Sequence, residues 1–150
     1  GHDIEASWLL VEAAQLLGNQ TLLQNIKDLS LHIADAASEG LQPDGSLIYE
    51  KDYSSGLANN TRNWWPQAEA VVGLINAFEL SGKKHYLKSA LKCWNYTNQN
   101  LVDHKAGEWF SAVSASGTVS KGDKAGFWKC PYHNGRMCME IIERVSKMEN

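Results

Sequence analysis

The first apolar stretch, residues 4–17, carries apolar side chains on nearly every side of a predicted helix. Glu5, Glu12 and Gln15 stand among them, and Gly18 follows in the manner of a helix C-cap. A helix without a polar face is usually buried on every side. The pattern therefore predicts a buried helix that ends near residue 17.

The later segments alternate between amphipathic and buried patterns. Residues 21–38 repeat apolar side chains at three- and four-residue steps with charges between them, which indicates an amphipathic helix. Residues 66–80 again leave little polar face, and residues 84–101 are amphipathic. A fifth helix is expected over residues 134–147. This alternation is what two concentric rings of helices produce, because only the outer ring faces water.

Two stretches are not expected to be helical. Residues 40–56 are rich in Gly, Pro and Ser and form a connection. Residues 108–129 alternate in part and carry Gly117 and Gly122, which favours a hairpin-like insertion. The repeat of about 65 residues is longer than the roughly 30 to 47 residues of common helical solenoids. Two helical pairs and the start of a third are too few to close a ring.

Composition narrows the class of protein. The net charge of −3 argues against a nucleic-acid surface, and no apolar run has the length of a membrane span. No signal peptide is visible, and three cysteines are too few for a disulfide framework. Nucleotide-binding and zinc-protease motifs are missing from the sequence. Six Trp residues are unusual and favour either a thick core or a surface that stacks flat ligands such as sugars.

Candidate chemistry gathers where the three buried helices begin. His2 and Glu5 lie at the first opening, Glu69 follows the second, and His133 and Arg136 lie at the third. If these helices run parallel, the side chains meet at one mouth of the ring. Histidines beside carboxylates suit proton transfer next to a carbonyl group. The plain alternative is that each His only caps a helix, but a carboxylate in an apolar helix, such as Glu69, is expensive to bury unpaired.

Four motifs, in family order, resemble the N-acylglucosamine 2-epimerase superfamily, and within it the cellobiose 2-epimerases. They are Gly-His-Asp-Ile-Glu-Ala-Ser-Trp-Leu-Leu (1–10), Trp-Trp-Pro-Gln-Ala-Glu-Ala (64–70), Gly-Glu-Trp-Phe (107–110) and Gly-Phe-Trp-Lys-Cys-Pro-Tyr-His-Asn-Gly-Arg (126–136). The resemblance implies an all-α fold, the (α/α)6 barrel, of which this chain is the C-terminal half. It also implies inversion at C2 of the reducing-end sugar of a β-1,4-linked disaccharide, without a metal or other cofactor.

The resemblance also implies roles for individual residues. His2 and His133 are expected to form the catalytic acid/base pair that acts through an enediolate. The remaining residues are expected to bind the sugar: Glu5, Trp65, Glu69, Trp128 and Arg136.

A complete member of this superfamily is about 400 residues long, so residues 1–150 are expected to be a single fragment of one barrel domain. We expect the fragment alone to be inactive and to associate with itself or with the missing N-terminal half, because its inner helices expose apolar surface. The resemblance further implies a cytoplasmic enzyme.

Other functions remain open on the sequence. An N-acylglucosamine 2-epimerase or an aldose–ketose isomerase of the same superfamily uses similar groups. Glu5 and Glu69 could instead serve a glycoside hydrolase as acid and base. The Trp residues could belong to a non-catalytic carbohydrate-binding helical module.

Overall fold

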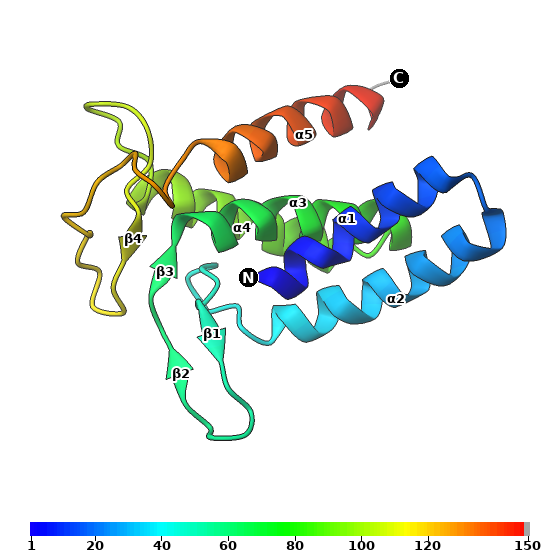
Figure 1. The fold of residues 1–150 in the computed structure, drawn as a ribbon, viewed down its shortest axis with the longest axis horizontal. Coiled ribbons are helices and arrows are strands. Elements are labelled where there is room, and N and C mark those ends of the chain that lie inside the picture. The colour runs from blue at the N-terminus through cyan, green and yellow to red at the C-terminus, as the bar shows by residue number, and fades with distance from the viewer. Residues whose placement is uncertain (149–150) are drawn as a thin grey trace.

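The computed structural model describes residues 1–148, and five α-helices form the body of this part of the chain (Figure 1). The helix ends differ from the predicted ranges by no more than two residues. Within residues 1–148, no helix is both long and apolar enough to cross a membrane. The helices are α1 (His2–Leu17), α2 (Gln20–Ser38), α3 (Trp64–Ser81), α4 (Lys84–Asn100) and α5 (Tyr132–Met148).

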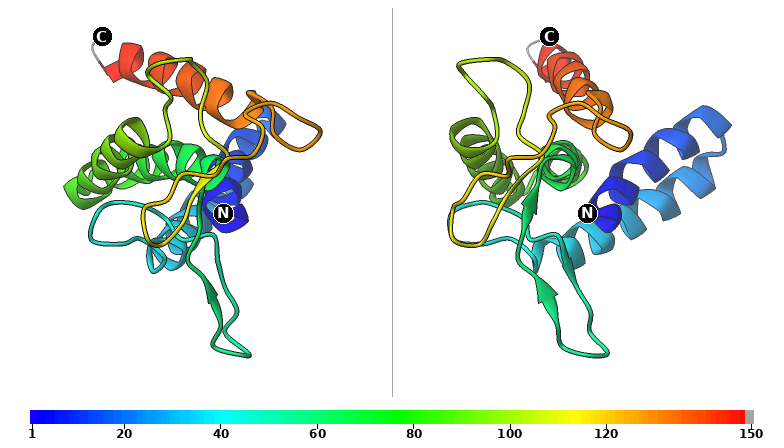
Figure 2. Two further views of the ribbon diagram at one scale, coloured as in Figure 1. Left: turned by 90° about the vertical axis from the view of Figure 1, so that its left-hand side faces the viewer. Right: turned by 60° about the vertical axis from the view of Figure 1, so that its left-hand side comes forward.

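Helix α3 lies at the centre of the bundle and packs against α1, α2, α4 and α5. In the right-hand view of Figure 2 it is seen nearly end-on with the other helices around it. Every residue from Pro66 to Ala77 is buried. The prediction of a helix buried on every side is therefore confirmed for α3.

Helices α1 and α5 are buried on one face only, which corrects the prediction that both of them are buried helices like α3. The side chain of Trp8 is 1% exposed, whereas Leu16 is 90% exposed. On α5, Met137 is buried and Ile142 is exposed. Among the described elements, α1 packs mainly against α2 and α3, and α5 packs mainly against α3, so their other faces meet solvent.

Helices α1, α3 and α5 run in the same direction (Figure 1). Arg144 in the C-terminal half of α5 pairs with Glu12 of α1 and with Glu79 of α3, which also lie in the C-terminal halves of their helices. The three N-termini must therefore share the opposite end of the bundle. This parallel arrangement is the condition under which the candidate residues were expected to meet.

Short strands organise the connections. Strands β1 (Glu50–Lys51) and β2 (Ala58–Asn59) form a projecting hairpin that the sequence pattern did not indicate. Strand β4 (Ala112–Val113) pairs with β3 (Arg62–Asn63), which directly precedes α3. The expected hairpin over residues 108–129 is present in part, as an antiparallel bridge between Val113 and Val119. The pairing of β4 with β3 is a long-range contact that local alternation cannot reveal.

A buried glutamine fixes the connection after α2 onto α3. The Gln67 side chain accepts a hydrogen bond from the backbone N–H of Leu47 and donates one to the Leu47 carbonyl, both at 2.8 Å. Gln67 is fully buried, so these bonds satisfy an amide that would otherwise be costly to bury. The connection is thereby held beside the N-terminal end of α3.

Candidate active site

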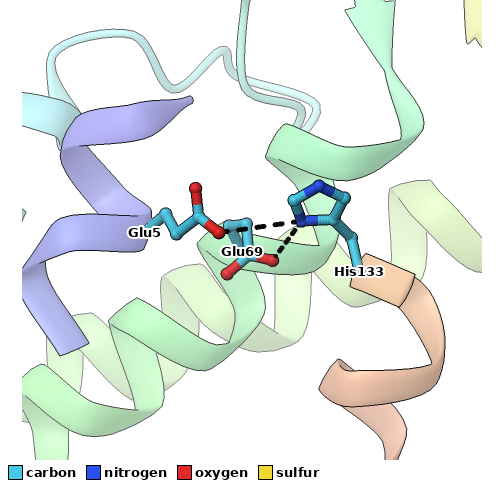
Figure 3. A group of neighbouring side chains, drawn as sticks. All are labelled: Glu5, Glu69 and His133. Atoms are coloured by element: carbon cyan, nitrogen blue, oxygen red, sulfur yellow. Dashed lines mark hydrogen bonds and ion pairs between the residues drawn. The ribbon is translucent and has the colours of Figure 1, made fainter. Parts of the chain in front are cut away.

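Side chains from the N-terminal turns of α1, α3 and α5 meet in one charged cluster. The Nη2 atom of Arg136 donates to Oε1 of Glu5 at 2.6 Å and to Oε1 of Glu69 at 2.7 Å. The Nδ1 atom of His133 lies 2.7 Å from Oε1 of Glu69 and 3.8 Å from Oε1 of Glu5. Figure 3 shows the imidazole facing both carboxylates across the space between three helices. The expected convergence of these four residues is confirmed.

Glu69 is the buried anion of the cluster. Its side chain is 1% exposed, and the indole N–H of Trp8 donates to its Oε2 at 3.0 Å. The other oxygen, Oε1, is hydrogen-bonded to both Arg136 and His133. A buried carboxylate is tolerated when it is paired and hydrogen-bonded, and here both oxygens have partners.

Arg136 supplies the permanent positive charge. Burial lowers the pKa of Arg136, but the hydrogen bonds to Glu69 and Glu5 outweigh burial and leave the pKa above its ordinary value. The guanidinium carbon lies 4.9 Å from the centroid of the Trp8 ring and 4.5 Å from that of Tyr132. Its Nη1 also donates to the Tyr132 hydroxyl at 2.6 Å. These contacts fix the plane of the guanidinium and so orient both carboxylates.

The hydrogen bond to Glu69 assigns the tautomer of His133. A carboxylate only accepts hydrogen bonds, so we assign a proton to Nδ1 of His133. In the neutral ring the second nitrogen, Nε2, then carries the free lone pair. Nε2 lies on the side of the ring away from the carboxylates (Figure 3). His133 is thus held as a base whose reactive nitrogen faces out of the cluster.

His2 and His133 pack against the same aromatic ring. The centroid of the Trp65 indole lies 4.8 Å from that of His2 and 5.4 Å from that of His133. His2 and Trp65 also line a pocket of about 340 Å³ between the start of α1, the end of α2 and the β1–β2 hairpin. Trp65 therefore joins the charged cluster to an open pocket.

Comparison with known proteins places the chain in a family. The model of the N-acylglucosamine 2-epimerase (GlcNAc 2-epimerase) family matches residues 1–135. The chain belongs to this family. A cellobiose 2-epimerase from Bacteroides fragilis is 50% identical over 143 residues, which are 95% of this chain and 36% of that protein.

Solved structures of sugar epimerases share the fold of this chain. A sugar epimerase from a ruminal bacterium is 41% identical with a TM-score of 0.89, over 95% of this chain and 37% of that one. Cellobiose 2-epimerase from Bacillus thermoamylovorans B4167 is 40% identical with a TM-score of 0.86, over 95% and 36%. The chain thus has the fold of part of an (α/α)6 barrel and spans little more than a third of these relatives.

Among the predicted site residues, Trp128 alone contacts none of the others within the part of the chain that the structure describes. Its side chain is 85% exposed, and its ring contact is with Phe127, at 5.0 Å between centroids. It stands in an irregular segment before α5, where no helix or strand of the described residues sets its direction. Its role in sugar stacking stays a prediction.

Two residues of the site were missed in the sequence. The position of Trp8 in the apolar pattern is that of a core residue. The pattern therefore gave no sign that its indole N–H donates a hydrogen bond to Glu69. Tyr132 lies in the Pro-Tyr-His motif, yet only the structure shows that it contacts Arg136. The adjacency of Tyr132 to His133, which places it in the first turn of α5, was the available signal.

The cluster has the donor atoms of a metal site. One ligand atom each from Glu5, Glu69 and His133 lie within 4.8 Å of one another. The same two carboxylate oxygens, however, accept hydrogen bonds from Arg136. A divalent ion would have to displace this guanidinium, so the donor set fits an arginine-bridged pair of carboxylates better than a metal. That this member of the N-acylglucosamine 2-epimerase family needs no metal stays a prediction.

Proposed function

We propose that the chain carries the acid/base residues of a sugar 2-epimerase. The substrate is a β-1,4-linked disaccharide of the cellobiose type, and the reaction inverts C2 of its reducing-end sugar. The kinship with cellobiose 2-epimerases supports this choice of substrate. The observation that carries the chemistry is the pair of histidines packed on Trp65, one of them held by a buried carboxylate.

The proposed reaction needs two bases and no redox partner. In the open-chain sugar, one histidine removes the proton from C2, and the electron pair of the C–H bond forms the C1–C2 double bond of an enediolate. The second histidine returns a proton to the opposite face of C2, which restores the aldehyde with inverted configuration. The C2 proton is acidic because the enediolate oxygen can be stabilised by nearby donors.

The charged cluster is assigned to positioning and to sugar binding. Glu69 holds Nδ1 of His133, which leaves Nε2 to exchange the proton. Arg136 keeps Glu5 and Glu69 in place and balances part of their charge. Trp65 and Trp128 are proposed to stack on sugar rings, since the flat apolar face of a pyranose packs well on indole.

We also propose that residues 1–150 act as part of a larger barrel domain in the cytoplasm. The relatives are nearly three times longer, and the exposed apolar faces of α1 and α5 are where further helices of a barrel pack. The chain by itself is then inactive, because one wall of the sugar site is missing. Its partners are the disaccharide and the remaining helices, with no nucleic acid or membrane among them.

A chimaeric enzyme tests the activity. The chain replaces the matching C-terminal segment of the Bacteroides fragilis cellobiose 2-epimerase, and cellobiose turnover is measured by product analysis. The chimaera is expected to form the C2-epimeric disaccharide. Replacement of His133 or His2 by Ala should lower kcat by about 10²–10⁴-fold. His32→Ala is the matched control, because His32 is an exposed histidine of α2.

The products separate the alternatives. Monosaccharides indicate a glycoside hydrolase that uses Glu5 and Glu69, and a ketose indicates an aldose–ketose isomerase. Turnover of an N-acylated hexosamine in place of cellobiose indicates an N-acylglucosamine 2-epimerase. Sugar binding without turnover by the chimaera indicates a binding module and contradicts the proposal.

A further inference from the structure

We infer that Glu108 is a positioning residue for His133 and acts through Lys129, Asn134 and Trp64. The inference about geometry stands on contacts within this chain. Its kinetic consequence rests on the proposed epimerase function. Glu108 lies outside the charged cluster described above and belongs to the connection between α4 and α5.

Glu108 has a backbone conformation that needs an explanation. It is the one non-glycine residue with positive φ (60°) in the part of the chain that the structure describes. This left-handed region is uncommon for a residue with a Cβ atom, and Glu lacks the short side chain that lets Asn or Asp visit it. Such conformations persist where surrounding contacts hold them, and they cluster at functional sites.

The carboxylate of Glu108 is held from the start of α5. Its Oε1 accepts hydrogen bonds from Nζ of Lys129 at 2.7 Å and from Nδ2 of Asn134 at 3.1 Å. Asn134 directly follows His133 in the first turn of α5 and is 6% exposed. Its Oδ1 is buried without a hydrogen-bond partner among the described residues, so Glu108 alone orients this amide.

Lys129 links Glu108 to Trp64, and Trp64 in turn contacts the imidazole of His133. The side chain of Lys129 is 7% exposed. Lysine is almost never buried to this extent unless it is paired, and here the partner is Glu108. The Nζ atom lies 5.0 Å from the centroid of the Trp64 ring, and Trp64 meets His133 edge-on with centroids 6.5 Å apart. Glu69 therefore holds one nitrogen of His133, while Trp64 and the first turn of α5 hold the ring from the Glu108 side.

The same connection offers a matched control. Lys124 pairs with Asp103 at 2.6 Å and donates to the carbonyl of Gly107 at 2.8 Å. This ion pair also ties the connection together, but among the described residues Lys124 contacts Asp103, Gly107 and Phe110 rather than α5 or Trp64. Loss of the Lys124 charge should therefore loosen the connection without moving His133.

The experiment uses the full chain and the ring resonances of His133 in ¹H–¹³C NMR spectra, assigned with His133→Ala. Glu108→Gln and Lys129→Met are expected to shift these resonances, Lys129→Arg to shift them less, and Lys124→Met to leave them in place. Thermal unfolding shows that each variant is folded. Unchanged His133 resonances in the first two variants, or equal shifts in Lys124→Met, overturn the inference.

A kinetic arm in the chimaeric enzyme tests the consequence for catalysis. Glu108→Gln is expected to lower kcat by about 10- to 10²-fold with little change in KM, since a small misplacement of a base slows the chemical step. If the chimaera is inactive in every form, the proposed function fails, while the NMR result still decides the inference. If both Glu108→Gln and Lys129→Met prevent folding, the cluster serves stability and the inference is wrong.

Discussion

The Nδ1 atom of His133 lies 2.7 Å from Oε1 of Glu69, although 64 positions separate the two residues in the chain. This contact joins the first turn of α5 to the most buried helix of the fold. It fixes the tautomer of a candidate base and places one acceptor between that base and Arg136. The stability of the helix bundle and the chemistry of the site therefore depend on the same carboxylate.

Removal of the Glu69 charge should destabilise the chain. Glu69→Gln keeps the size of the side chain but has only one acceptor oxygen. Either Trp8 or the pair of Arg136 and His133 therefore faces an NH2 group, and the remaining acceptor is uncharged. Hydrogen bonds to charged groups make larger net contributions than neutral ones, so we expect a loss of about 1–3 kcal/mol in the free energy of unfolding. Urea denaturation measures it.

The control for this substitution is Glu143→Gln. Glu143 pairs with Lys147 one turn along α5, and both side chains are well exposed. Exposed pairs of this kind contribute little to stability, so the midpoint of unfolding should hardly move. Equal losses of unfolding free energy in the two variants would show that the buried Glu69 charge contributes no more to stability than an exposed one, which contradicts the prediction.

Gly73 is expected to resist replacement by alanine. A Cβ atom at Gly73 would lie 2.8 Å from both the carbonyl oxygen and Cγ1 of Ile4, where α1 crosses α3. Alanine in a helix interior normally gains about 0.5–1 kcal/mol over glycine. Here the overlap with the backbone of α1 should reverse the sign and destabilise the fold by about 1–3 kcal/mol. Urea denaturation gives the difference.

Gly135→Ala supplies the comparison for Gly73→Ala. Gly135 is helical in α5, and nothing lies within 4 Å of a Cβ atom placed there. Its replacement should be neutral or stabilising. A stabilised Gly73→Ala variant would contradict the close approach of α1 and α3.

Asp103 should make the connection between α4 and α5 sensitive to acid. The hydrogen bond from Lys124, helped by the backbone N–H groups of Ala106 and Lys105, lowers the pKa of Asp103 from 3.8 to about 2. A carboxyl whose pKa is lower in the folded state stabilises the fold above its unfolded pKa, and this contribution disappears as the pH falls through the folded value. Asp103→Asn should therefore lower Tm above pH 3.8.

The pH dependence of this difference is the measurement. Tm of the chain and of Asp103→Asn is followed as the pH falls towards 2, and the gap between the two curves should close. A gap that stays constant with pH would mean that the ion pair with Lys124 does not carry the effect.

The exposed apolar face of α5 should cause self-association of the isolated chain. Met139 and Ile142 are 66% and 68% exposed, and contiguous exposed apolar side chains favour association. The double replacement of Met139 and Ile142 by Gln should shift sedimentation velocity profiles towards monomer. Leu91→Gln on α4 is the control, since Leu91 is exposed on a different helix. A chain that is monomeric without any substitution contradicts this expectation.

The sequence alone determined the helices of this protein. Apolar periodicity and capping residues are local signals, so the ends of α1 to α5 could be predicted closely. The candidate residues Glu5, Glu69, His133 and Arg136 could be chosen because charged groups at the starts of apolar helices need partners. Four short motifs further indicated the family, which the match over residues 1–135 confirmed.

Only the tertiary structure decided which groups are partners. Arg136 and His133 share an oxygen of Glu69, while the exposed Trp128 lies outside the cluster. The pairing of β3 with β4, like the contacts of Glu108, joins residues far apart in the chain. Such contacts depend on how helices pack and on where connections cross. Periodicity records which side of a segment is apolar, but it carries no information about which other segment will cover it.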